Sequence, residues 1–337
     1  MNKKDRSQAS GNKTHQSSRS WEVSDAEPDS SLGCVLGSAV GDALGAPFEF
    51  LSPGAFSERF PWDNSDNEMI GNSLWEPGEF TDDTQMAILE TLAFLDAGNL
   101  EEALPLAFAK FASWSQSGPK DIGISTSDVL CDPDYRTAAS DYFEENPHAA
   151  AGNGGLMRAS FIAARGSFGS HSDSVEMARK FSALTHGDPS ASEGRALWHS
   201  LIFAAVRGEE DVFGEPLDWA LDELEEEHRE LYADMLSPHP PTRLPNGTVW
   251  GCMRDAAQAL RRSDSFEDCM RIACDSGDDV DTVAAVAGSL AGAVYGVHDI
   301  PERWLEALNG EVLGEFYDAD ALIDLHDKVL AVPRPEN

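Results

Sequence analysis

Positive charge is scarce in this sequence. Only 24 Lys and Arg stand against 60 Asp and Glu in 337 residues, which gives a formal net charge of −36 at pH 7. A charge of this sign repels the phosphates of nucleic acids and anionic membrane surfaces, so we expect neither as a partner. It still allows a phosphorylated small molecule, because bound metal ions can reverse the charge of a site.

Cysteine and long apolar runs are scarce as well. The five cysteines are odd in number and include no Cys-x-x-Cys pair. This argues against a disulfide framework and a thiolate zinc site, and it favours a reducing compartment. No apolar amino-terminal segment predicts a secretory signal. The run 283–297 falls short of the ~20 residues that span a bilayer, and its many Ala and Gly residues predict a buried helix. We therefore expect a cytoplasmic, monomeric protein without a membrane span.

Strand signals are also rare, whereas apolar residues at helical spacing are common. Met86, Leu89 and Leu92 recur at such spacing, and Pro105 is suited to the first turn of the next helix. Long alternating runs of Val, Ile and Thr are scarce. From residue 29 to residue 334 the pattern therefore predicts a single all-α domain.

The first 28 residues have a different composition from the rest. They are mostly Ser, Lys, Asn, Gln and Asp and carry no periodic apolar face. Such a composition cannot bury enough apolar surface to fold, so residues 1–28 are predicted to be a disordered polar tail. The functional alternative is an arm that engages a partner.

A first acidic segment lies at the end of a glycine-rich helix. Its glycines recur every fourth residue at Gly33, Gly37, Gly41 and Gly45. They share one helix face and permit close packing there, although each costs roughly 1 kcal/mol relative to Ala. Pro47 should end the helix and release Glu49 into a loop. Close packing explains the glycines but not Glu49.

Two further acidic segments lie where helices should begin. One reads Thr81-Asp82-Asp83-Thr84 and the other Asp278-Asp279-Val280-Asp281-Thr282. Helix capping would explain one acid and one hydroxyl of the first, and a solvated acidic loop would explain the second. Adjacent carboxylates repel one another unless a cation lies between them, and oxygen ligands suit Mg²⁺ or Mn²⁺. If the two segments face each other, they could hold a pair of ions.

Six segments together resemble one protein family. They are the glycine helix ending at Glu49, Thr81–Thr84, Asp121-Ile122-Gly123, Gly152–Arg158, Thr185–Asp188 and Gly277–Thr282. Each segment is a weak signal alone, but six in the same order are specific. The set resembles the ADP-ribosylglycohydrolases, especially the bacterial dinitrogenase-reductase-activating type.

The resemblance implies a fold and a site. The fold would be all-α, a compact orthogonal bundle of many helices with two Mg²⁺ or Mn²⁺ ions at the base of a cleft. Glu49 and Asp121 would be the catalytic acids. The metal ligands would be Thr81, Asp82, Asp83, Asp279, Asp281 and Thr282. The substrate-binding residues would be Asn153, Gly154, Met157, Arg158 and His186.

The resemblance also implies a reaction, the hydrolysis of ADP-ribose from a modified protein side chain, with ADP-ribosyl-arginine as the expected substrate. Its transition state resembles an oxocarbenium ion. The ions would orient the ribose and polarise a water, while Glu49 or Asp121 would guide that water or protonate the departing nitrogen. Three alternatives stay open. They are another ADP-ribosyl linkage, such as serine or a small ADP-ribosyl compound, a non-catalytic ADP-ribose-binding protein, and a toxin-immunity protein.

Overall fold

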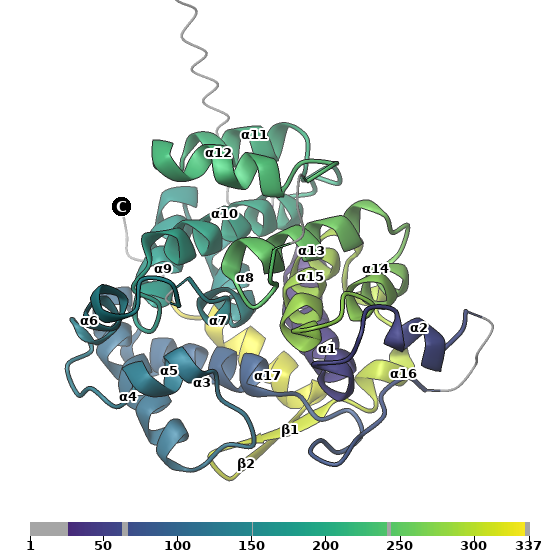
Figure 1. Ribbon diagram of the computed structural model, residues 1–337, viewed down its shortest axis with the longest axis horizontal. Helices are drawn as coiled ribbons and strands as arrows, with labels where there is room; N and C mark the ends of the chain where they lie inside the picture. Colours follow the sequence, from purple (N-terminus) through teal and green to yellow (C-terminus); the bar gives the residue numbers. More distant parts are fainter. Residues whose placement is uncertain (1–25, 63–66, 150, 241–243, 334–337) are drawn as a thin grey trace, which may run out of the picture.

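Helices make up most of the described chain (Figure 1). The structure is a computed structural model and describes residues 26–62, 67–149, 151–240 and 244–333. The earlier helices are α1 (Pro28–Gly45), α2 (Ala55–Arg59), α3 (Asp82–Ala97), α4 (Leu100–Gln116), α5 (Ile124–Val129), α6 (Ala138–Glu145), α7 (Gly154–Met157), α8 (Ser160–Gly166) and α9 (His171–Ala183). The later helices are α10 (Pro189–Val206), α11 (Glu215–Asp222), α12 (Glu226–Met235), α13 (Val249–Arg261), α14 (Phe266–Cys274), α15 (Val280–Tyr295), α16 (Glu302–Leu305) and α17 (Ala319–Leu330). The 3₁₀ turns are η2 (Ala46–Phe48) and η3 (Val297–Asp299), and the strands are β1 (Asn309–Val312) and β2 (Glu315–Asp318).

Helices α1 and α15 form the centre of the molecule and pack against each other along their lengths (Figure 1). The glycine face predicted for α1 is the contact surface, since a Cβ atom at Gly41 would lie 2.1 Å from a backbone oxygen of α15. Helix α15 contributes Gly288 and Gly292, which leave room for carbonyl oxygens of α1. The contact continues to the end of α1, where Gly45 lies against the backbone of Asp281. Close packing thus brings the end of one acidic segment beside the start of another.

This central pair also accounts for the apolar character of α1. By length and composition, the 21-residue segment Pro28–Phe48 could cross a membrane. However, 89% of its apolar window is buried inside the molecule, so the segment is a core helix of this fold. Helix α15 confirms the buried helix predicted over residues 283–297, with bounds Val280–Tyr295.

The other helices surround the central pair. Helix α10 packs against α9 and α15, α13 and α14 pack on α15, and α3 pairs with α4. In Figure 1, α11 and α12 lie beyond α10 at one end of the molecule, and the β1–β2 hairpin lies at the opposite end. Helix α7 contacts both α3 and α15, so the glycine-rich segment that contains α7 lies beside the two helices that begin with acidic residues. The predicted all-α class is therefore confirmed.

The short antiparallel hairpin of β1 and β2 was not predicted. Its strands have four residues each, and neither Asn309–Val312 nor Glu315–Asp318 alternates apolar with polar side chains, the pattern that reveals a strand. The hairpin holds the segment before α3, because the Phe80 N–H donates to the Asn309 carbonyl and the Asn309 N–H donates to the Gly78 carbonyl, both at 2.9 Å. It thereby fixes the approach of the chain to Thr81.

The structure bears on two predicted boundaries, the end of the polar tail and the start of the helix that contains Pro105. Most of the predicted tail, residues 1–25, lies outside the described residues, and Pro28 already begins α1. The prediction that Pro105 lies in the first turn of its helix is wrong. Helix α4 begins at Leu100, where the Asn99 side chain accepts the Glu102 N–H at 3.0 Å and caps the helix. The cap moves the start one turn earlier than the proline alone suggests.

Candidate active site

Most of the predicted site residues line one cavity of about 370 Å³. The predicted residues in its lining are Glu49, Asp82, Asp83, Asp121, Asn153, Gly154, Met157, His186, Asp279, Asp281 and Thr282. The lining residues without a predicted role are Gly123, Ile124, Ser125, Thr126, Tyr142, Ala149, Gly152 and Gly247. The structure therefore collects segments from both halves of the chain around a single cavity.

The start of α3 is held by an acid that the sequence analysis did not assign. Asp42, fully buried on α1, accepts the Thr81 N–H at 3.0 Å, and the Thr84 hydroxyl at 2.6 Å. Thr81 caps α3 by accepting the Asp83 N–H at 3.4 Å, and it lies buried beside the cavity rather than in its lining. The arrangement points Asp82 and Asp83 into the cavity. Asp42 follows Gly41 and lies about 100° around α1 from the glycine face, so no local pattern in the sequence indicates its role.

The start of α15 is held by two asparagines. The Asn153 side-chain amide donates to Asp279 Oδ2 at 2.7 Å and to the Asn246 carbonyl at 2.9 Å. The Asp281 carboxylate accepts the Thr282 N–H at 2.9 Å. The side chain of Asn246 in turn donates to the Gly277 carbonyl at 2.9 Å, which braces the loop before α15. No local pattern in the sequence indicates this role of Asn246.

Glu49 follows η2 and meets the start of α15. One carboxylate oxygen from each of Glu49, Asp279 and Asp281 lies within 4.8 Å of the others. This proximity follows from the α1–α15 contact, since both helix ends reach the cavity together. The expectation that Glu49 leaves its helix for a loop is met, because α1 ends at Gly45 and η2 at Phe48.

Burial and mutual repulsion disfavour the charged forms of these acids. Burial, then the charges of Asp121 and Asp279, raise the pKa of Glu49 to about 8. Burial also raises the pKa of Asp82 and Asp83 well above the usual range of an aspartate, with neighbouring carboxylates adding to the effect. The cavity therefore concentrates negative charge that lacks a compensating cation among its lining residues.

This donor set fits a divalent cation. Oδ1 of Asp83 is buried and has no hydrogen-bond partner among the described residues. A buried carboxylate oxygen without a partner is costly unless it binds a cation. The clustered oxygens of Glu49, Asp279 and Asp281 add further donors of the kind that Mg²⁺ and Mn²⁺ prefer.

A glycine-rich wall and His186 form another side of the cavity. A Cβ atom at Gly154 would lie 2.9 Å from the His186 ring, and one at Gly152 would lie 3.1 Å from it. Burial, together with the nearby charges of Arg158 and Arg195, lowers the pKa of His186 to about 3. The ring is therefore neutral at pH 7. Small residues are required here because the imidazole occupies the space of their side chains.

Arg158, which was expected to bind substrate, is not among the residues that line the cavity. The side chain is fully buried and forms an ion pair with Glu90, with 3.0 Å between Nε and Oε2. It also donates to the Gly154 carbonyl at 2.6 Å and to the Thr185 hydroxyl at 2.8 Å. A second buried arginine, Arg195, shares Glu90. Arg158 thus supports the glycine-rich wall from behind, because its charge is fully used in the core.

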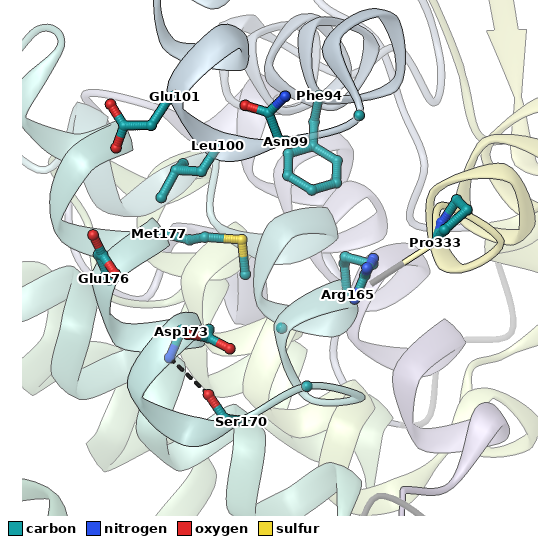
Figure 2. Close-up of a pocket in the computed structure, with 13 residues that line it drawn as sticks. Phe94, Asn99, Leu100, Glu101, Arg165, Ser170, Asp173, Glu176, Met177 and Pro333 are labelled. Carbon is teal, nitrogen blue, oxygen red and sulfur yellow. Dashed lines mark hydrogen bonds between the residues drawn. The ribbon is translucent and has the colours of Figure 1, made fainter. Parts of the chain in front are cut away.

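A second cavity of about 370 Å³ lies between the α3–α4 turn, α8 and α9 (Figure 2). Figure 2 shows Phe94 and Met177 between these elements, with Glu101 and Glu176 at one side. Both glutamates form ion pairs with Lys180. The described lining of this second cavity contains none of the predicted site residues. It shares no residue with the first cavity, which we call the acidic cavity.

Fold and site together define an all-α protein whose acidic cavity is built at the starts of α3 and α15. The chain belongs to the ADP-ribosylglycohydrolase family, whose model matches residues 24–334. The resemblance inferred from the six motifs is thereby confirmed.

Several relatives match most of the chain. The ADP-ribosyl-[dinitrogen reductase] glycohydrolase of Rhodospirillum rubrum is 30% identical over 308 residues, which cover 88% of this chain and 96% of that protein. The ADP-ribosylarginine hydrolase Tri1 of Serratia proteamaculans (strain 568) is 29% identical over 301 residues, covering 83% and 75%. A solved structure described as an ADP-ribosylglycohydrolase-related protein complex is 31% identical, with a TM-score of 0.68, and the match covers 90% of this chain and 98% of the other.

Proposed function

We propose that this protein hydrolyses the bond between ADP-ribose and a modified protein side chain, with ADP-ribosyl-arginine as the substrate. The observation that carries the proposal is the grouping of Glu49, Asp279 and Asp281 in the cavity of a family member. A relative described as an ADP-ribosyl-[dinitrogen reductase] glycohydrolase supports a modified protein as the substrate, and one described as an ADP-ribosylarginine hydrolase supports arginine as the acceptor.

We further propose that the cavity holds two Mg²⁺ or Mn²⁺ ions. Their ligands would be Thr81, Asp82, Asp83, Asp279, Asp281 and Thr282. When bound, such ions supply positive charge to the ribose hydroxyls and to a nucleophilic water. The raised pKa values of Asp82 and Asp83 and the unpartnered Asp83 oxygen support this assignment, since each indicates a missing positive charge.

The residues of the chain would handle the substrate and the protons. Gly152, Gly154 and His186 would shape the wall against which the ADP-ribose lies. In the reaction, the bond from the anomeric carbon to the arginine nitrogen breaks and a bond to the water oxygen forms. Glu49 and Asp121 would share the two proton-handling roles, one taking a proton from the water and the other giving one to the departing nitrogen.

The deciding experiment measures free ADP-ribose released from an arginine-ADP-ribosylated protein, with Mg²⁺ or Mn²⁺ and with EDTA. We expect release with either metal and none with EDTA. A parallel assay on a serine-linked substrate tests the alternative linkage. Tight binding of ADP-ribose without turnover of any substrate, in folded and metal-loaded protein, would contradict the proposal and favour a binding role.

The remaining expectations concern partners and location. We propose an ADP-ribosylated protein or a small ADP-ribosyl compound as the partner of the cavity, and a monomer in the cytoplasm without nucleic acid or membrane partners. The net charge of −36 supports the exclusion of nucleic acid and anionic lipid. Sedimentation of the purified chain and its location in fractionated cells would test the last two expectations.

A further inference from the structure

Phe50, directly after Glu49, has an unusual backbone conformation. Its φ is +64°, in the left-handed region that glycine and asparagine adopt most readily. Among the described residues, only Asp278 and Leu313 share this conformation without being glycine. A bulky residue in the left-handed region is an outlier, and such outliers cluster at functional sites.

Backbone hydrogen bonds explain why residue 50 is left-handed, but they do not explain why it is a phenylalanine. The Phe50 N–H donates to the Asp278 carbonyl at 2.7 Å, and the Asp278 N–H donates to the Leu51 carbonyl at 3.2 Å. These bonds join the loop of Glu49 to the loop of Asp279. Both bonds use main-chain atoms alone, so glycine or asparagine would make them with less strain.

Burial does not explain the side chain either. Phe50 is 81% exposed, so its ring contributes little to the core. Ile124, which lines the cavity, is also 81% exposed and therefore lies where the cavity opens to solvent. Glu49 and Asp121 are close enough for their charges to interact. Glu49 directly precedes Phe50 in the sequence, and Asp121 lies three residues before Ile124, the first residue of α5. Exposed apolar side chains thus accompany both proposed catalytic acids.

We propose that Phe50 contacts the polypeptide that carries the ADP-ribosylated side chain. This inference rests on the proposed glycohydrolase activity. If the ADP-ribose occupies the acidic cavity, the modified arginine reaches the acids from outside, and the polypeptide around it must lie at the opening. The exposed aromatic side chain of the residue that directly follows Glu49 is then available to pack on the apolar and main-chain groups that flank the arginine.

The test compares two substrates in the full-length chain and its Phe50→Asn variant. Asn accepts the left-handed conformation, so the backbone bonds to Asp278 and Leu51 remain. For an arginine-ADP-ribosylated carrier protein, we expect KM to rise about tenfold, the range of a lost aromatic contact, with kcat unchanged. For free ADP-ribosyl-arginine, we expect both constants to match the wild type.

Leu313→Asn is the matched control. Leu313 is also left-handed, with a φ of +53°, and is 46% exposed, but it lies in the turn between β1 and β2. The substitution relieves the same kind of strain away from the cavity, so both substrates should be hydrolysed as by the wild type. Phe50→Tyr keeps the ring and should restore the wild-type KM for the carrier protein.

The outcomes separate the possibilities. An unchanged KM for the carrier protein in Phe50→Asn overturns the proposal. An equal loss on both substrates also overturns it, because Phe50 would then support the Glu49 loop rather than the polypeptide. Thermal unfolding of the variant should occur at or above the wild-type temperature. If the wild type hydrolyses neither substrate, the proposed function itself fails, and this inference fails with it.

Discussion

At the scale of single residues, the cavity is dominated by carboxylates that are held away from water. Asp83 and Asp281 are almost fully buried, and burial raises the pKa of each well above its usual range. Charged acids in such a place destabilise the chain unless a cation compensates them. The same groups should therefore lower the stability of the metal-free protein and raise the stability gained when metal binds.

Asp281→Asn tests both effects of a buried acid, the lower stability without metal and the stability gained when metal binds. The amide oxygen can still accept the Thr282 N–H but carries no charge. We expect the metal-free variant to unfold at or above the temperature of the metal-free wild type, because one buried charge is removed. The rise in unfolding temperature on adding Mn²⁺ should be largely lost, together with activity. Differential scanning calorimetry with and without Mn²⁺ measures both effects.

Asp278→Asn is the control for this substitution. Asp278 is exposed, and Asn keeps its left-handed backbone conformation. The variant should retain the full stabilisation by Mn²⁺. If the Asp281→Asn variant still gains the wild-type stabilisation by Mn²⁺, or still hydrolyses substrate, Asp281 is not a metal ligand.

Arg158 illustrates a residue whose importance lies in the core. Arg158→Met leaves Glu90 with Arg195 alone and removes the bonds to Gly154 and Thr185. Because Arg195 still compensates Glu90, the cost comes from the buried Gly154 carbonyl and Thr185 hydroxyl, which each lose a donor at about 1–3 kcal/mol. The free energy of unfolding measured in urea should therefore fall by about 2 kcal/mol or more. Stabilisation by Mn²⁺ should persist, since the acids are untouched. A large loss of Mn²⁺ binding with unchanged stability would show instead that Arg158 acts at the cavity.

At the scale of elements, the α1–α15 contact decides where the acids meet. The contact leaves no space for side chains at the glycines of α1, and it sets the end of α1 against the start of α15. Helix α3 is then fixed to α1 through Asp42 and to the hairpin through Phe80. The acidic ends of α1, α3 and α15 therefore meet, because α3 and α15 are both attached to α1.

Gly41→Ala should disrupt this contact. Alanine favours a helix by about 1 kcal/mol over glycine. However, its Cβ would lie 2.1 Å from the Ala284 carbonyl oxygen, a clash with backbone that cannot move cheaply. We expect a net loss of about 3 kcal/mol or more in the free energy of unfolding, measured by urea denaturation.

Gly123→Ala is the matched control for the packing argument. A Cβ atom there would meet only the Thr126 hydroxyl, at 3.7 Å, which is ordinary contact. Its stability should stay within about 0.5 kcal/mol of the wild type. A Gly41→Ala protein as stable as this control would mean that α1 and α15 can separate without cost.

At the scale of the whole molecule, buried neutral histidines couple stability to pH. Burial, then the charges of Arg179 and Arg207, lower the pKa of His171 to about 4. The pKa of His186 falls to about 3 for similar reasons. In the unfolded chain both rings take up a proton as the pH falls through about 6.5. The stability they contribute is thus complete above pH 6.5 and is lost as the pH falls toward 4 and then 3.

His171→Asn should remove part of this acid sensitivity. His171 packs on Trp219 and bonds to the Ser200 hydroxyl at 2.8 Å, so the variant is less stable at pH 7.5. The deficit should shrink as the pH falls from 6.5 to about 4, because the wild type alone loses the neutral-histidine contribution of roughly 3 kcal/mol. Urea denaturation at pH 7.5 and 5.0 measures the change. A deficit that is equal at both pH values would show that His171 titrates alike in both states.

The sequence alone determined several features correctly because they depend on local patterns. Helical spacing and scarce strand signals predicted the all-α class, and four glycines on one face predicted a close helix contact. Paired acids at helix starts indicated that carboxylates gather at one site, and the order of six motifs indicated the family. Helix periodicity fixes which face of an element is packed, so these predictions needed no knowledge of the partner element.

Only the tertiary structure decided what each face meets. Asp42 and Asn246 hold the acidic segments through contacts across the chain, and no local pattern distinguishes them from ordinary polar residues. The sequence motifs assigned Arg158 to substrate binding, but in the structure Arg158 is buried in the core and pairs with Glu90. Phe50 acquires its left-handed backbone only by pairing with Asp278, far along the chain. Such roles depend on non-local contacts, which the sequence lists as residues but does not arrange in space.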